Sequence, residues 1–128
     1  MNAATMESPE WMRRAACRGG EPTDWDTDRW EAHARGNIVR ALDRDMSVAE
    51  LCADCPVAAQ CAADALALPD TAAGVVRAGV PLPNYPRSRS RRQLDALAAI
   101  AGGTRPDVAV FAGWVRDKPA AVRRWVKR

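Results

Sequence analysis

Four cysteines are the side chains of this 128-residue chain that are best suited to chemistry, and the chain has no others. Cys52, Cys55 and Cys61 stand in a C-x2-C-x5-C run, and Cys17 precedes them alone. Two thiolates three residues apart can bind one inorganic centre, a third can join from the next helical turn, and an upstream cysteine completes an all-sulfur ligand set. The pattern therefore predicts a metal ion or an iron–sulfur cluster rather than four separate packing residues.

Two short helices are expected to position the cysteine run. Pro56 predicts the start of a helix over residues 57–68, with Cys55 as its N-cap, where free amides and the helix dipole favour a thiolate. A capping box over residues 47–50 predicts a separate short helix that leads to Cys52. Small alanines around the ligands would let a bulky inorganic group approach the backbone.

Upstream segments are also expected to be helical. Residues 8–10 fit the start of a short helix that leads toward Cys17, with Ser8 as the N-cap. Residues 28–45 have helical character, which Gly36-Asn37 is expected to interrupt. No segment shows a convincing strand pattern, so the chain is expected to be all-α.

Charge divides the chain into two parts. Residues 1–86 hold 8 Arg or Lys against 13 Asp or Glu, a balance of −5, and residues 87–128 hold 11 against 3, a balance of +8, which together give the net charge of +3. A proline-rich segment, residues 81–87, separates them and indicates a stiff linker. We therefore expect a cysteine-bearing domain over residues 1–80 and a basic module over residues 88–128.

The basic module is expected to be a three-helix, helix-turn-helix-like unit that contacts DNA. Its helices are predicted over residues 88–101, from Pro106 to about Val115, and from Pro119 to the C-terminus. Residues 116–119 would form the turn, and the last helix would enter the major groove. The residues expected to contact DNA are Arg116, Lys118, Arg123, Arg124, Lys127 and Arg128. A helical hairpin with a solvated basic face, or a tail that docks on another protein, remains open.

Composition limits the other function classes. The first sixteen residues contain no apolar core of a secretory signal, and no apolar run approaches the length of a membrane span. We therefore expect a cytoplasmic protein whose reduced thiols serve as ligands rather than as permanent disulfides. The lone His33 is expected to be an ordinary surface residue.

Two stretches resemble a known family. Residues 11–18, Trp-Met-Arg-Arg-Ala-Ala-Cys-Arg, are similar to the opening of the WhiB-like regulators of actinobacteria and their phages, and residues 52–57 with Cys61 resemble the cysteine motif of that family. The resemblance spans roughly residues 9–80. It differs over residues 74–79, where Val76 replaces the Trp of the family's Gly-Val/Ile-Trp-Gly-Gly turn. The long spacing between the first two cysteines also suggests an insertion.

The resemblance implies a function. It implies a helical domain that binds one [4Fe-4S] cluster through Cys17, Cys52, Cys55 and Cys61. It also implies a transcription factor, without enzymatic activity or a small-molecule substrate, that responds to redox change or nitric oxide. Such proteins bind region 4 of the primary sigma factor, and their cysteines can form disulfides when the cluster is lost.

Two other functions use the same cysteines. A structural adaptor would bind one zinc ion in a tetrahedral all-thiolate site. A thiol–disulfide reductase would work through Cys52 and Cys55, but a thioredoxin-like fold needs strands that this sequence does not predict.

Overall fold

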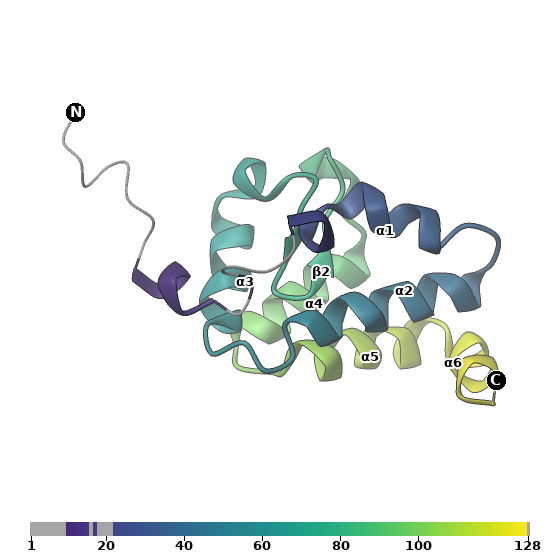
Figure 1. Ribbon diagram of the computed structural model, residues 1–128. Helices are drawn as coiled ribbons and strands as arrows, with labels where there is room; N and C mark the ends of the chain where they lie inside the picture. The colour runs from purple at the N-terminus through teal and green to yellow at the C-terminus, as the bar shows by residue number, and fades with distance from the viewer. Residues whose placement is uncertain (1–9, 16, 18–21, 128) are drawn as a thin grey trace.

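Helices dominate the structure, a computed structural model that describes residues 10–15, 17 and 22–127 (Figure 1). The described α-helices are α1 (Thr27–His33), α2 (Ile38–Leu51), α3 (Ala58–Ala67), α4 (Arg91–Ala101), α5 (Pro106–Asp117) and α6 (Pro119–Lys127). The 3-10 helices are η2 (Glu10–Arg14), η3 (Pro22–Trp25), η4 (Pro69–Ala72) and η5 (Pro86–Ser88), and the strands are β1 (Val76–Arg77) and β2 (Val80–Pro81). The all-α prediction is confirmed, because the only described sheet has two residues in each strand. The expected helix start at residues 8 and 9 lies outside the described residues.

The first two α-helices meet where the sequence indicated a break. Gly36 has a φ of +109°, which favours glycine, and Asn37 caps α2 by accepting a hydrogen bond from the backbone N–H of Arg40 at 2.9 Å. The separate helix predicted at residues 47–50 is wrong. Ser47 lies inside α2, which continues to Leu51, because the preceding residues already bury an apolar face that includes Leu42 and Met46.

A small hairpin follows α3 and is the main departure from the expected all-helical chain. Strands β1 and β2 pair antiparallel, with Val76 opposite Pro81. Ala78 and Gly79 form the turn with φ values of +53° and +83°, the left-handed pair that a two-residue hairpin needs. Two-residue strands show no alternation in a sequence, so only the glycines indicated this turn.

A single buried core joins the cysteine-bearing part to the C-terminal helices. Figure 1 shows α5 and α6 beside α2, and α4 packs against α3. Leu82, within the proline-rich segment, is fully buried in the same core. The largest fully buried side chains are Trp114, Leu42, Leu82, Leu97, Ile100, Val48 and Val57. The expected division into a domain over residues 1–80, a linker at 81–87 and a basic module over 88–128 stays a prediction.

The three C-terminal helices are confirmed, although the first begins at Arg91 rather than at residue 88. A capping box between Ser90 and Gln93 begins α4, and prolines begin α5 and α6. Gly113 on α5 is buried, whereas its neighbour Ala112 is exposed. A Cβ at Gly113 would lie 2.9 Å from the Arg92 side chain, so glycine permits the close crossing of α4 and α5.

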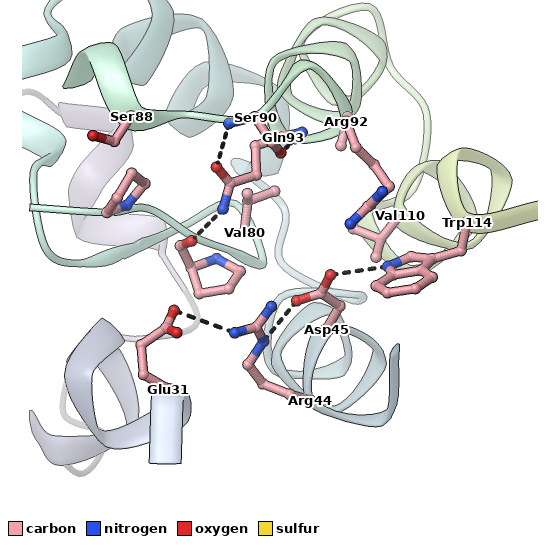
Figure 2. Close-up of a pocket in the computed structure, with 13 residues that line it drawn as sticks. Glu31, Arg44, Asp45, Val80, Ser88, Ser90, Arg92, Gln93, Val110 and Trp114 are labelled. Atoms are coloured by element: carbon pink, nitrogen blue, oxygen red, sulfur yellow. Dashed lines mark hydrogen bonds and ion pairs between the residues drawn. The ribbon is translucent and has the colours of Figure 1, made fainter. Parts of the chain in front are cut away.

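Polar contacts reinforce this packing around a cavity of about 300 Å³ between α2, β2, α4 and α5 (Figure 2). The indole of Trp114 donates to Asp45 Oδ2 at 2.9 Å, and Arg44 Nε donates to Asp45 Oδ1 at 2.9 Å. The guanidinium of Arg92 lies over the Trp114 ring, 4.2 Å from its centroid. Among the helices described, none is long and apolar enough to cross a membrane.

Candidate functional site

All four cysteines line one cavity of about 340 Å³, roughly ten times the liquid volume of one water. Cys52 is the C-cap of α2, Cys61 lies in α3, and Cys55 lies in the loop between these helices. Cys17, which follows η2, reaches the same cavity from the N-terminal part. The other lining residues are Trp11, Met12, Ala15, Trp25, Val57, Ala58, Val76, Arg77 and Ala78.

The loop between α2 and α3 folds tightly around the middle of the cysteine run. The backbone N–H of Cys55 donates to the Cys52 carbonyl at 3.1 Å, and the N–H of Ala58 donates to the Cys55 carbonyl at 3.3 Å. These bonds form a turn before α3, whose N-cap is Val57. The prediction that Cys55 is the N-cap is therefore wrong, because the turn delays the first helical residue to position 58.

The thiols influence one another electrostatically. Burial is the largest cause that raises the pKa of Cys52 to about 12, and the charges on Cys61, Cys55 and Cys17 raise it further. A backbone hydrogen bond from Gly79 has the opposite effect and lowers this pKa. Burial, followed by the charge on Cys61, also raises the pKa of Cys17. Ionising all four thiols together is costly, because the resulting thiolates repel one another. A bound cation or cluster would offset that repulsion.

One cation contacts a cysteine of the cavity. Arg77 Nε donates to Cys61 Sγ at 3.2 Å, and Arg77 Nη2 donates to the Cys61 carbonyl at 3.3 Å and to Asp64 Oδ2 at 2.7 Å. The guanidinium thus connects β1 to α3 at the rim of the cavity. Charge and spacing along the chain did not indicate this contact, because the residues lie 16 positions apart.

The rest of the cavity is mainly apolar and includes one unpaired donor. Trp11, Met12 and Val76 line it, as does Trp25, whose buried indole Nε1 has no hydrogen-bond acceptor among the described residues. An unsatisfied buried N–H is unusual in a protein interior and suggests an acceptor that the protein atoms do not supply. A sulfur-rich anionic group would be such an acceptor, so the donor set and the cavity fit an iron–sulfur cluster.

In the part of the chain that the structure describes, no group of three or more His, Cys, Asp or Glu side chains is placed to hold a single metal ion. A tetrahedral zinc site requires four sulfurs at about 2.3 Å from one point. A cluster offers a separate iron to each thiolate, so its ligands can stand further apart around a larger volume.

Other predicted site residues lie elsewhere. His33 pairs with Asp43 at 3.0 Å on the surface, away from the thiols. Among the basic residues, Lys118, Arg123, Arg124 and Lys127 are exposed, and Arg128 lies outside the described residues. Arg116 is exposed but forms ion pairs with Asp117 at 2.8 Å and Asp95 at 3.2 Å.

The surface of α6 differs in part from the expected one. Val122 is buried, and Trp125 packs on Phe111 at 6.2 Å between ring centroids and donates to Asp43 Oδ1 at 3.1 Å. Val126 is 65 % exposed, because α6 is docked on α2 as well as on α5. The basic face of the helix remains accessible beside it.

The comparison with family models places the cysteine cavity in a known context. The model described as "Transcription factor WhiB" matches residues 11–94, which contain all four cysteines and the hairpin. The chain belongs to the WhiB family. The match continues past the proline-rich segment into α4, further than the resemblance over residues 9–80 had indicated. No curated protein and no solved structure matched the chain. Membership of the WhiB family makes this protein a transcription factor and confirms the recognition drawn from the cysteine motif.

Proposed function

We propose that this WhiB-family transcription factor binds one [4Fe-4S] cluster through Cys17, Cys52, Cys55 and Cys61 and regulates transcription in response to redox change or nitric oxide. The convergence of all four thiols on one cavity supports this proposal most strongly. Such a cluster, when bound, supplies one-electron redox chemistry and iron that reacts with nitric oxide. The protein is proposed to act in the cytoplasm, without an enzymatic activity or a small-molecule substrate.

The residues around the cavity have separate tasks in this proposal. The thiols would act as ligands, Trp11, Met12 and Val76 would restrict access of water, and the buried indole N–H of Trp25 would offer a donor beside the bound group. Loss of the group would leave four thiols close enough to influence one another. Disulfide formation between them after cluster loss is therefore part of the proposal.

Two macromolecular partners are proposed. Region 4 of the primary sigma factor follows from the family resemblance, and DNA from the exposed basic face of α6, formed by Arg123, Arg124 and Lys127, with Lys118, Arg116 and Arg128 as further contacts. Binding to purified sigma region 4, measured by calorimetry with cluster-loaded protein, tests the first partner. An absence of binding would remove the sigma factor from the proposal and leave the cluster unaffected.

A zinc-binding adaptor is the alternative for the same thiols. The volume of the cavity that all four thiols line, about 340 Å³, favours a cluster over a single ion. A CxxC reductase has less support, because a catalytic thiol needs a lowered pKa, whereas burial raises the pKa of Cys52 to about 12.

Anoxic purification with iron and sulfide analysis tests the proposal. The protein should be brown and contain about four irons and four sulfides per chain, as one cubane requires. Each single Cys→Ser variant should lose most of the iron, whereas His33→Ala, the matched control away from the cavity, should retain it. Colourless wild-type protein with one zinc per chain would establish the adaptor instead.

A further inference from the structure

Arg77 is the charged side chain that the structure fixes against a cysteine of the cavity. Its side chain is 13 % exposed, and its guanidinium is held by hydrogen bonds to Cys61 Sγ, to the Cys61 carbonyl and to Asp64 Oδ2. The planar guanidinium uses separate N–H groups for the sulfur and for the carboxylate, a geometry that a lysine ammonium cannot reproduce. The side chain is therefore positioned by α3 rather than free to leave the sulfur.

The charge on Arg77 persists in this setting. An arginine guanidinium is not deprotonated in proteins, and Asp64 Oδ2 accepts a hydrogen bond from this one at 2.7 Å. A permanent cation thus lies at hydrogen-bond distance from a sulfur that we assign as a ligand. Hydrogen bonds to the sulfurs and nearby charge are two of the factors that set the reduction potential of an iron–sulfur cluster.

We propose that Arg77 raises the reduction potential of the bound cluster and slows its loss by holding Cys61 in place. This proposal rests on the proposed cluster function. Reduction adds one electron to the bound group and makes it more negative, without breaking a bond. A fixed positive charge stabilises that more negative state, and the N–H donor stabilises the thiolate ligand, so both effects act in the same direction.

The test compares Arg77→Gln with wild-type protein, both loaded with cluster under anoxic conditions. Spectroelectrochemistry, in which the electrode supplies the electron, should give a more negative midpoint potential for Arg77→Gln. Iron release to a chelator should be several-fold faster, because Cys61 loses its donor and its anchor. Arg77→Met removes charge and donors while keeping an apolar stem, and it should change both readouts in the same direction if Arg77→Gln folds poorly.

Arg89→Gln is the matched control. Arg89 also binds the α3 end of the molecule, through the carbonyls of Ala65 at 3.0 Å and Pro69 at 3.0 Å, but it does not line the cysteine cavity. The Arg89→Gln variant tests the effect of removing any anchored arginine. It should leave the midpoint potential and the rate of iron release near the wild-type values. Arg77→Lys, which keeps the charge, should recover part of the potential.

The outcomes separate this inference from the proposed function. Wild-type protein that binds no iron refutes the cluster and the inference together. Wild-type protein that binds the cluster, with unchanged potential and iron release in both Arg77→Gln and Arg77→Met, refutes the role of Arg77 alone. Equal shifts in Arg77→Gln and Arg89→Gln would also refute it, because the effect would then be one of general packing.

Discussion

Trp114 and Asp45 are joined by a hydrogen bond of 2.9 Å from the indole Nε1 to Oδ2, and this bond connects α5 to α2 (Figure 2). The Trp114 side chain is 1 % exposed, and the Asp45 side chain is 14 % exposed. Cys52 is the C-cap of α2, so a proposed ligand lies at the end of the helix on which α5 and α6 pack. Packing of α5 and the geometry of the cysteine cavity therefore depend on the same element.

Removing the N–H of Trp114 should destabilise the protein. Trp114→Phe keeps an aromatic ring but leaves Asp45 without one of its buried donors, which should reduce the free energy of unfolding by about 1.5–3 kcal/mol. Trp125→Phe is the control, because Trp125 and Asp43 form a similar bond at a more exposed position. Urea denaturation measures both variants, and a loss no greater for Trp114→Phe than for Trp125→Phe would contradict the importance of this bond.

A side chain at Gly79 should destabilise the hairpin turn. Its φ is +83°, and an added Cβ would lie 3.0 Å from Cα of Ala49 and 3.2 Å from Cβ of Pro106. Gly79→Ala therefore combines backbone strain with a steric conflict against α2 and α5. Gly103→Ala shares only the backbone strain, since its φ is +106° and nothing lies within 4 Å. Gly79→Ala should be the less stable of the two by about 1–3 kcal/mol in urea denaturation.

Metal-free, reduced protein should lose stability in alkaline solution. Burial raises the pKa of Cys52 from 9.0 to about 12, so the folded state keeps a proton that the unfolded state releases first. The resulting contribution to stability is fully present below the unfolded value of 9.0 and is lost as pH rises from there toward about 12. Urea denaturation across this range should show the decline, and Cys52→Ala should flatten it. A decline of the same size in Cys52→Ala would assign the effect to other groups.

Basic residues on α6 should contribute to DNA affinity by neutralising phosphates. The triple variant Arg123→Ala, Arg124→Ala, Lys127→Ala should weaken binding to duplex DNA and reduce the slope of log affinity against log salt by about 0.9 for each phosphate that is no longer neutralised. Arg116→Ala should have a smaller effect, because Asp117 and Asp95 already pair with this arginine. Fluorescence anisotropy at several salt concentrations measures the slopes. An unchanged slope in the triple variant would mean that α6 does not contact DNA.

Local signals predicted much of the secondary structure. Prolines at positions 106 and 119 begin helices where expected, and Gly36-Asn37 separates α1 from α2, because backbone restrictions act on neighbouring residues and need no distant partner. Ser47 shows the limit of such signals. Its capping pattern was overridden by the apolar face of α2, whose burial stabilises a continuous helix.

The sequence by itself determined the four cysteines, the helical class and the basic C-terminal surface, because residue type, local spacing and charge are properties of the chain before it folds. Only the tertiary structure decided that Arg77 lies against Cys61, that the Trp25 indole N–H has no acceptor among the described residues, and that Trp114 bonds Asp45, 69 positions away. Such pairings depend on how α2, α3 and the hairpin pack. Packing follows from burial of side chains that are distant in sequence, which no local pattern records.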